Sequence, residues 1–249
     1  MRIASYNILN GGLGRLDPLA ETLAVIDADV IALQEASDPA GVAHLAQRGR
    51  YDSFIAESVQ GPYHVALLSR LPIRRAVNLS MAASLNRSAF DAVIDVGGTD
   101  IQLVGVHLPS GFRPEVEQQR IDEVNALLAG LTGDLPTCLL GDFNSHAPWH
   151  SIEIEQAPPH RRDQCRAADR GDNAKLLPHL QDRGWTDIHH QYLGDNVPHT
   201  FETGHPFMRV DYLLADATLA ERVTEVGVDQ RGFAPYCSDH FPIWADFSV

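Results

Sequence analysis

The 249-residue chain has few of the features that mark membrane, secreted or disulfide-stabilised proteins. Its three cysteines, Cys138, Cys165 and Cys237, are odd in number and widely spaced, which argues against a disulfide framework and against a zinc site. No apolar run approaches the roughly 18–20 residues that a membrane span needs. Met1 leads directly into an apolar segment, without the parts of a signal peptide. We therefore expect a cytoplasmic protein without a membrane span.

Positive charge is also scarce. The chain has 19 Lys and Arg against 33 Asp and Glu, so its formal net charge is −14 with the 12 histidines neutral. Proteins that bind nucleic acid usually present a basic face, so this balance argues against tight, non-specific binding to long duplex DNA. We expect some of the carboxylates to belong to a metal site, where a bound cation would neutralise part of their charge.

The sequence contains no repeat, no low-complexity tract and no linker rich in Pro, Gly or Ser. At 44% hydrophobic and 21% charged residues, it can bury a sizeable core. Length alone allows one domain or two, but the missing linker favours a single domain over residues 1–249. We expect this domain to be monomeric.

Short apolar runs predict strands through most of the chain, and apolar residues at helical spacing predict a few helices between them. Asp17 is expected to cap the first helix, Gly97-Gly98 to form a hairpin turn, and residues 145–175 to be irregular. The predicted helices cover 17–26, 39–49, 114–131 and 175–184. The predicted strands cover 3–8, 29–34, 51–58, 64–69, 73–80, 87–96, 101–108, 136–143, 208–215, 222–229 and 242–249.

Many strands with few, separated helices are typical of two stacked sheets flanked by helices, and not of a doubly wound parallel sheet. At six places an apolar run ends in, or is interrupted by, a polar cluster. A polar side chain at the end of a buried strand lies at the rim of a sheet, where ligands gather in α/β folds. These clusters offer mostly hard oxygen donors and two imidazoles, which suits a Mg²⁺-type cation and a phosphate ester. They are SYN (5–7), Glu35 after DVIALQ, GVH (105–107), LLGDFN (139–144), RVDYLL (209–214) and SDH (238–240).

Glu35 is either a metal ligand or an ordinary carboxylate in a turn after a strand. In GDFN, Gly141 permits a close backbone approach and Asp142 offers an acceptor, and Asn144 shares the face of Asp142 if the segment is extended. The alternative for GDFN is an Asx-type turn that closes a strand.

Asp239 and His240 are adjacent, so in a strand they face opposite ways and should have different roles, Asp239 toward a metal and His240 toward a phosphate. Asp211 lies inside an apolar strand, where an unpaired carboxylate would be costly. We predict an imidazole partner for it, and favour His240 over His107. The alternative to a functional role for His107 is a hydrogen-bonded histidine in the core. The alternative for Asn7 is a residue in a turn.

Other polar residues give weaker signals. Arg161 and Arg162 belong to a basic run (residues 160–170) that is either a solvated loop or a clamp for the substrate. His189, His190, His199 and His205 lie in loop-like sequence without a spaced carboxylate partner, and Cys237 is expected only to pack.

Taken together and in order, these clusters resemble the endonuclease/exonuclease/phosphatase superfamily of magnesium-dependent phosphoesterases, with the motif set of its deoxyribonuclease-like members. The superfamily includes pancreatic-type deoxyribonucleases, abasic-site endonucleases, inositol-polyphosphate 5-phosphatases, neutral sphingomyelinases and tyrosyl-DNA phosphodiesterases. The matching stretches run from residue 5 to residue 243. They are SYNILN, DVIALQE, LLSRLPI, GVHL, LLGDFN, RVDYLL and SDHFPI.

The resemblance implies a four-layered α/β sandwich of two packed, mostly antiparallel sheets flanked by helices, with the site at one end of the sheets. It implies that Glu35 is the principal metal ligand, with Asn7 and Asp239 close to the cation or its waters. The implied cation is Mg²⁺, for which Mn²⁺ can substitute.

The resemblance also implies catalytic roles. Asp142 orients or deprotonates the attacking water, with Asn144 beside it, and His240, paired to Asp211, stabilises the phosphoryl group. His107 assists the leaving group or contacts a phosphate oxygen. Abasic-site enzymes carry an aspartate shortly after the first-strand Asn, whereas Ile8, Leu9 and Asn10 follow Asn7 here. That departure, together with His107, points away from the abasic-site branch.

We therefore expect a hydrolase that attacks a phosphoester by in-line displacement with water and without a covalent enzyme intermediate. Asp142 or a histidine would handle the proton of the water, and Asn7, Asn144 and His240 would bind the substrate as donors to its developing charge. The first hypothesis for the substrate is a phosphodiester of DNA, RNA or a nucleotide end, cleaved by a nuclease or phosphodiesterase. The alternative is a phosphatase or phosphodiesterase for a small or lipid-derived ester, of the inositol-phosphate or sphingomyelinase type, which the negative net charge favours. A remote alternative is a catalytically dead binding module, and the complete set of acid, amide and imidazole groups argues against it.

Overall fold

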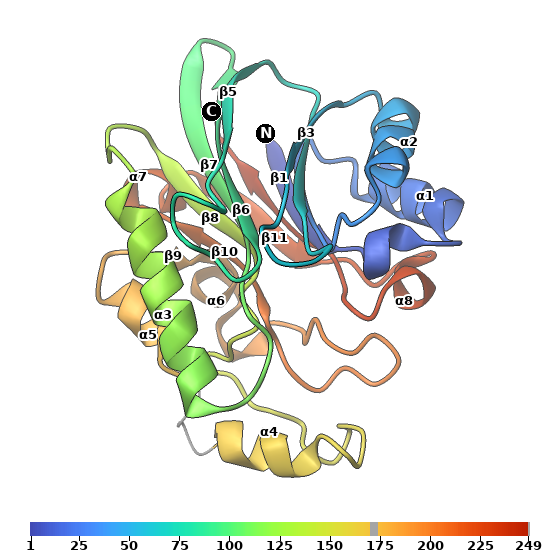
Figure 1. Cartoon of the computed structure of the whole chain (residues 1–249), viewed down its shortest axis with the longest axis vertical. Coiled ribbons are helices and arrows are strands. Elements are labelled where there is room, and N and C mark those ends of the chain that lie inside the picture. Colours follow the sequence, from blue (N-terminus) through green and yellow to red (C-terminus); the bar gives the residue numbers. More distant parts are fainter. Residues whose placement is uncertain (170–173, 249) are drawn as a thin grey trace.

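Two six-stranded sheets stacked face to face form the centre of the computed structural model, which describes residues 1–169 and 174–248 (Figure 1). The first sheet contains, in spatial order, β11 (Val223–Val228), β12 (Ile243–Phe247), β1 (Arg2–Asn7), β2 (Val30–Gln34), β4 (Val65–Ser69) and β3 (Asp52–Ala56). The second contains β5 (Ile73–Asn78), β6 (Ser88–Val96), β7 (Thr99–His107), β8 (Thr137–Asp142), β10 (Asp211–Ala215) and β9 (Thr186–Asp187). Only β1 with β2 and β7 with β8 pair in parallel within the described residues, so both sheets are mostly antiparallel, as predicted.

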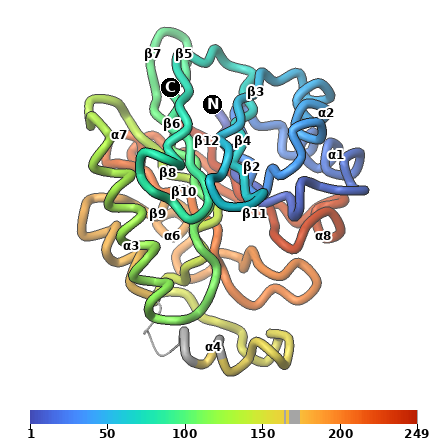
Figure 2. The backbone as a smooth tube through the Cα atoms, in the orientation of Figure 1, coloured from blue at the N-terminus to red at the C-terminus, as the bar shows by residue number. Residues whose placement is uncertain are grey.

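Helices cover the outer faces and complete four layers (Figure 2). On the first sheet lie α1 (Leu16–Ile26), α2 (Pro39–Gly49) and α8 (Ala234–Cys237), and on the second lie α3 (Pro114–Ala129) and α5 (Leu176–Gln181). The shorter elements are α4 (Arg162–Asp169), α6 (Ile188–Leu193), α7 (Ala217–Ala220) and the 3₁₀ turns η1 (Asn10–Gly12) and η2 (Gly194–Asn196).

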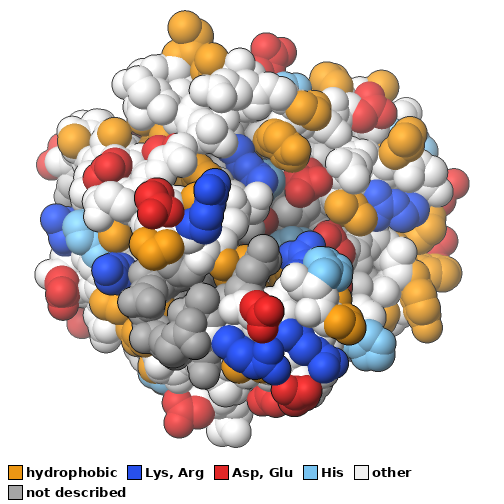
Figure 3. All heavy atoms as spheres, turned by 60° about the horizontal axis from the view of Figure 1, so that its bottom comes forward, with side chains coloured by type: hydrophobic (Ala, Val, Ile, Leu, Met, Phe, Trp, Pro, Cys, Tyr) orange, Lys and Arg blue, Asp and Glu red, His pale blue; other side chains and the backbone are white. Residues whose placement is uncertain are grey.

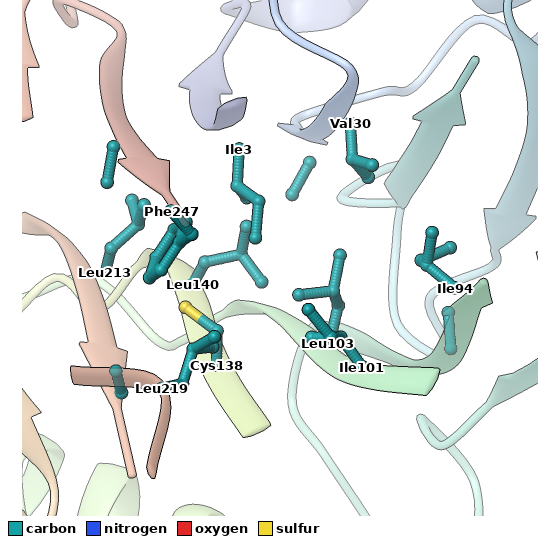
Figure 4. Packing of buried hydrophobic residues seen from close by; sticks show 14 of the residues in the cluster. Ile3, Val30, Ile94, Ile101, Leu103, Cys138, Leu140, Leu213, Leu219 and Phe247 are labelled. Carbon is teal, nitrogen blue, oxygen red and sulfur yellow. The ribbon is translucent and has the colours of Figure 1, made fainter. Parts of the chain in front are cut away.

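The core between the sheets explains the continuous apolar runs in the sequence. Ile3 and Val30 point inward and meet Leu103 and Leu140 from the second sheet, among other side chains of the cluster in Figure 4. The neighbouring Ala4 and Ile31 point outward, where helices cover them. Because both faces of these central strands are buried, alternation between apolar and polar residues disappears.

The predicted strands and the four predicted helices are all present, with ends that differ by a few residues. The capping prediction for α1 is wrong. The helix begins at Leu16 with Arg15 at the cap position, so Asp17 lies inside the first turn, with its carboxylate 3.0 Å from Arg48 Nη1. The Gly97-Gly98 hairpin is confirmed, because Val96 pairs with Thr99 across it and both glycines have positive φ.

Part of the segment predicted to be irregular is helical. α4 buries Cys165 in a small apolar cluster with Ile152, Phe201 and Phe207. A helix of eight residues is too short to show a clear apolar period in its sequence, which explains the wrong prediction. The predicted basic run extends to Arg170, which lies outside the described residues. The other unpredicted elements, such as α6 and α8, are too short for a recognisable period.

The two ends of the described chain meet at one end of the sandwich (Figures 1 and 2). The amino group of Met1 donates a hydrogen bond of 2.8 Å to the carbonyl of Phe247, and Arg2 pairs with Asp246 in the antiparallel register of β1 and β12. Asn7, at the other end of β1, is therefore at the opposite end of the molecule. The three cysteines are buried and unpaired. Within the described residues, no helix has both the length and the apolar character that crossing a membrane requires.

Candidate active site

Polar side chains at the strand ends lie together at the end of the sandwich away from the termini. Asn7 closes β1 and Glu35 directly follows β2, its parallel neighbour. In the second sheet, His107 pairs with Asp142 in the parallel register of β7 and β8, and Asp142 pairs with Asp211, the first residue of β10. In Figure 3, which brings the lower part of the Figure 1 view forward, acidic, basic and histidine side chains lie close together.

The Asn7 amide connects the two sheets. Its Nδ2 donates a hydrogen bond of 3.0 Å to Asp142 Oδ2 and lies 3.4 Å from Glu35 Oε1. Glu35 has a positive φ of 54° and accepts a 2.8 Å hydrogen bond at Oε2 from the backbone N–H of Asn10. The structure thus brings Asn7, Glu35 and Asp142 together, although they lie far apart in the sequence.

Asp142 occupies the centre of the cluster. Its Oδ2 also lies 3.4 Å from His107 Nε2 and 3.8 Å from His240 Nε2. Burial, which disfavours the charged form, raises the pKa of Asp142 to about 6, even though the positive charge of His240 opposes this shift. A carboxyl group with a pKa near neutrality can take up a proton from a water molecule.

The GDFN segment forms a turn, which was the alternative to an extended segment. Asn144 has a positive φ of 49°, and its N–H donates a hydrogen bond of 2.9 Å to Asp142 Oδ1, as in an Asx-type turn. Asn144 Nδ2 donates to the carbonyl of Leu108 at 3.1 Å. The prediction that Gly141 permits a close backbone approach is confirmed, because a Cβ at that position would overlap the carbonyl oxygen of Val106. The turn fixes Asp142 through one carboxylate oxygen and leaves the other within reach of Asn7 and the histidines.

The predicted pair of His240 and Asp211 is confirmed, with 2.9 Å between His240 Nδ1 and Asp211 Oδ2. Burial alone would lower the pKa of His240, but the negative charges of Asp211 and Asp142 outweigh it and raise this pKa to about 10. His240 is therefore a buried imidazolium at neutral pH, held by Asp211.

His107 has the opposite protonation state. It is fully buried, and this burial, the Arg87 guanidinium and His240 all lower its pKa well below the usual value. Nη1 of Arg87 contacts His107 Nε2. An arginine can only donate, so Nε2 accepts and the neutral ring carries its proton on Nδ1.

Arg87, directly before β6, was not predicted to belong to the site. It is buried, donates a 2.9 Å hydrogen bond from Nη2 to Ser110 Oγ and lies 4.5 Å from the centre of the Tyr63 ring. Among the described residues it forms no ion pair with a carboxylate, whereas buried Arg120 pairs with Glu117 and buried Arg209 with Asp187. A buried cation without a counter-ion is unfavourable unless a bound anion compensates it. The sequence gives no signal for this, because its partners Ser110 and Tyr63 are distant in the chain.

Several carboxylates gather in this region. Ser238 Oγ donates a hydrogen bond of 2.6 Å to the Asn7 carbonyl, which places partly exposed Asp239 beside β1. Glu35, Asp142, Asp211 and Asp239 supply these carboxylates. Their hard oxygen donors fit a divalent cation such as Mg²⁺. Asp142, Asp211 and His240 also place possible ligand atoms within 4.8 Å of one another. A protonated His240 has no free lone pair, however, so the oxygen atoms are the better candidates.

The two predicted arginines differ in position. Arg161 lines a pocket of about 190 Å³ beside His240 and Asn144, together with Ser110, Gly111, Phe112, Phe201, Met208 and Val210. Arg162 instead binds its own segment, with hydrogen bonds to the carbonyls of Ala157 (3.0 Å) and Glu155 (2.8 Å). The structure therefore brings Arg161 to the site but not Arg162. His189 and His199 hydrogen-bond to the backbone elsewhere, at the carbonyls of Gly227 and Ser151.

The sequence matches the model of the Endonuclease/Exonuclease/phosphatase family over residues 4–240. Among solved structures it is similar to an AP endonuclease from Archaeoglobus fulgidus, at a TM-score of 0.77 and 20% identity over 100% of both chains. The 3′ phosphatase NExo from Neisseria, bound to a product DNA hairpin, matches at 0.72 and 22% over 100% of both chains. Humanized D. rerio TDP2 matches at 0.70 and 18%, over 100% of this chain and 99% of that one. At such identities the likeness concerns the fold, so the predicted departure from the abasic-site branch stays a prediction.

Proposed function

The chain belongs to the endonuclease/exonuclease/phosphatase family, and from this premise we propose that it is a divalent-metal-dependent hydrolase of phosphodiester or phosphomonoester bonds. One domain over residues 1–249 would carry the activity. The observation that supports this most is the Asn7 amide, which holds Glu35 and Asp142 in one cluster with His240. Such a cluster combines groups for a cation, a water molecule and a phosphate within a few ångströms.

Glu35, Asn7 and Asp239 would hold the cation, which we propose to be Mg²⁺, with Mn²⁺ as a substitute. The bound cation supplies Lewis-acid chemistry and neutralises charge on the phosphoryl oxygens. Glu35 is suited to this role because Asn10 fixes one of its oxygens at 2.8 Å, so that its carboxylate keeps one orientation.

Asp142 would orient the attacking water and accept its proton. Its pKa, raised to about 6, leaves it mostly ionised at neutral pH while keeping it basic enough for this transfer. Asn144 holds one oxygen of Asp142 through its backbone N–H, and Asn7 holds the other. The water would attack the phosphorus in line with the leaving group, without a covalent enzyme intermediate.

His240 and Arg87 would bind the phosphoryl oxygens, which become more negative as the transition state forms. Asp211 keeps His240 protonated and oriented. Arg87 lies against neutral His107 and has no carboxylate partner among the described residues, so it is available to an anion. His107 would contact a phosphate oxygen or assist the leaving group. Donors of this kind act most strongly when they are fixed before the reaction.

For the substrate we propose first a phosphodiester of a nucleic acid or nucleotide, which would make the protein a nuclease or phosphodiesterase. The alternative is a small or lipid-derived phosphate ester, and the net charge of −14 favours it because long duplex DNA would be repelled. The complete set of acidic, amide and imidazole groups argues against a catalytically dead binding module. We propose that the protein acts as a monomer in the cytoplasm.

The test is a substrate panel with Mg²⁺, with Mn²⁺ and with EDTA. It contains bis-p-nitrophenyl phosphate and the corresponding monoester, plasmid DNA, a single-stranded oligonucleotide, RNA, inositol phosphates and sphingomyelin. We expect hydrolysis that requires the metal, and faster turnover of the diester than of the monoester if the first hypothesis holds. Steep salt dependence of DNA binding would also favour the nuclease. Absence of metal-dependent turnover on every substrate would contradict the proposed function.

A further inference from the structure

The pocket beside His240 is lined by both apolar and polar side chains. Phe112, Phe201, Met208 and Val210 are the apolar ones, and Ser110, Asn144, Arg161 and His240 are the polar ones. Its volume of about 190 Å³ equals the space of about six water molecules at about 30 Å³ each. That space suits one ring-sized group, and a base pair would not fit into it.

The Phe201 ring lies close to both His240 and Arg161. The His240 ring centre is 4.8 Å from the centre of the Phe201 ring, and the guanidinium carbon of Arg161 is 5.1 Å from the same point. Since each lies about 5 Å from that centre, the imidazole and the guanidinium are at most about 10 Å apart. Both residues line the pocket, so a group that fills it would contact His240 and Arg161 together.

Arg161 is only loosely held. Its Nε lies 3.4 Å from Glu202 Oε1, longer than the usual 2.7–2.9 Å of a charge-assisted hydrogen bond. Its neighbour Arg162 is fixed by hydrogen bonds to two backbone carbonyls. A phosphate could thus replace Glu202 as the partner of Arg161, since a guanidinium binds phosphate through paired donors.

We propose that Arg161 determines specificity by binding a second phosphate of the substrate. This inference rests on the proposed function, in which His240 binds the phosphate that is hydrolysed. The two phosphates would be carried by one ring-sized unit that packs against Phe201. A nucleotide unit of a single strand has this chemistry, and so does a small polyphosphorylated ring. Glu202 competes with the second phosphate for Arg161, and therefore tunes the preference.

A matched pair of chromogenic esters tests the proposal, the p-nitrophenyl ester of thymidine 5′-phosphate with and without a 3′-phosphate. The measured quantity is the preference, the ratio of kcat/KM for the ester with the second phosphate to that for the ester without it. We expect Arg161→Gln to lower this preference about tenfold, mainly through KM, because it removes a charge-assisted contact. Glu202→Gln should raise the preference, since Arg161 loses its competing partner.

Arg162→Gln is the matched control and should leave the preference unchanged, while Arg161→Lys should restore part of it. A second arm compares phosphate release from an inositol bisphosphate and an inositol monophosphate, and so distinguishes a small ring polyphosphate from a nucleotide. If Arg161→Gln lowers kcat/KM equally for both thymidine esters, or leaves the preference as in the wild type, Arg161 has no specificity role and the proposal fails.

A separate binding measurement distinguishes this proposal from the proposed function. If the wild type turns over neither ester with Mg²⁺ or Mn²⁺, calorimetry of thymidine 3′,5′-bisphosphate and thymidine 5′-phosphate replaces the kinetics. Weaker binding of the bisphosphate alone in Arg161→Gln would support the second phosphate site without the hydrolase. An equal change for both ligands, or none, would overturn the site.

Discussion

The two flanks of the candidate active site use opposite charges. The oxygen flank, consisting of Asn7, Glu35 and Asp239, comes from the first sheet and its loops and offers only oxygen atoms and an amide. The cationic flank consists of Arg87, His107 and His240 and contains two positive charges and a neutral imidazole. Asp142 lies between the flanks, 3.0 Å from Asn7 Nδ2 and 3.4 Å from His107 Nε2. A phosphate with a bound cation needs both kinds of partner. The first sheet and its loops supply the oxygen flank and His240, and the second sheet supplies Arg87 and His107.

The flanks also differ in what holds them. In the oxygen flank, Glu35 and the neighbouring Leu9 and Asn10 have positive φ, so the backbone itself takes an uncommon conformation there. In the cationic flank the backbone is mostly regular. The unfavourable energy there is electrostatic, because charges are buried beside one another. The first flank is therefore sensitive to ligand geometry, and the second to charge and pH.

The largest expected effect comes from disrupting the oxygen flank. EDTA should abolish turnover and added Mg²⁺ should restore it, and Glu35→Ala should lower kcat by about 10²–10³ or more, because the cation would lose its proposed principal ligand. Turnover of a chromogenic ester and calorimetric titration with Mn²⁺ measure both effects. Exposed Glu221→Ala is the control. Near-wild-type turnover in Glu35→Ala would falsify the assignment of this flank.

The next effect concerns the charge of His240. Asp211→Asn should lower kcat by about 10², because the imidazolium loses its orienting partner. The positive form of His240 exists below its pKa, which burial lowers and Asp211 and Asp142 raise to about 10. Without the charge of Asp211 this pKa falls, so activity should be lost at a lower pH as the pH rises. Profiles of kcat between pH 6 and 10 test this, and identical alkaline limbs in wild type and variant would rule out the charged histidine.

A comparison of two buried arginines separates binding from stability. Arg87→Gln should weaken inhibition by inorganic phosphate about tenfold. It should leave Tm unchanged or raise it, since it removes a buried cation that lacks a carboxylate partner among the described residues. Arg209→Gln should instead cost about 3–5 kcal/mol of folding stability, because it leaves Asp187 buried and unpaired. Thermal unfolding and phosphate inhibition check both. A large loss of Tm in Arg87→Gln would mean that Arg87 is structural.

The smallest effect contrasts His240 with a buried histidine outside the site. His150 Nε2 accepts a 2.9 Å hydrogen bond from Arg209, so this ring is neutral, and burial followed by the charge of Arg209 lowers its pKa to about 3. In the unfolded chain the pKa is about 6.5, so the unfolded state gains the proton first, and stability falls as the pH drops below about 6.5.

The loss from His150 should reach about 1.4 kcal/mol per pH unit at most. Urea unfolding at pH 7.5 and pH 5 measures it. His150→Gln keeps an acceptor for Arg209 without a titrating group and should flatten the pH dependence. An unchanged slope in this variant would show that other groups cause the acid sensitivity.

Much of the fold and of the cluster could be predicted because both follow from strand geometry. An apolar run that ends in a polar residue predicts a side chain at the sheet rim, which places Asn7, Glu35, Asp142 and Asp211 at one end. The cost of burying a carboxylate predicted a partner for Asp211, and the structure confirms His240. The catalytic and metal-binding roles of these residues stay predictions.

The other site residues and the short elements depend on contacts between segments that are distant in the sequence, and these contacts leave no pattern in the local sequence. Arg87 belongs to the candidate active site because Ser110 and His107 lie next to it in space. Arg161 lines the pocket beside His240 and its neighbour Arg162 does not, although the two arginines are adjacent in the sequence. The cap of α1 and the helix α4 were predicted wrongly because short elements depend on a few tertiary contacts. Sequence patterns thus predict which strands end at a site, but not which neighbouring charges complete it.

The chain ends lie close together and away from the candidate active site, so the order of the strands along the chain can be changed without altering that site. Met1 and Phe247 are hydrogen-bonded to each other, and the Gly97-Gly98 turn lies at the same end, since Ser88, at the far end of β6, pairs with His107. A short linker could join the present ends, and new ones could be opened at the glycine turn. Such a circular permutant should keep the strand ends around Asp142 in place, and a partner fused at this end would leave the opposite end accessible.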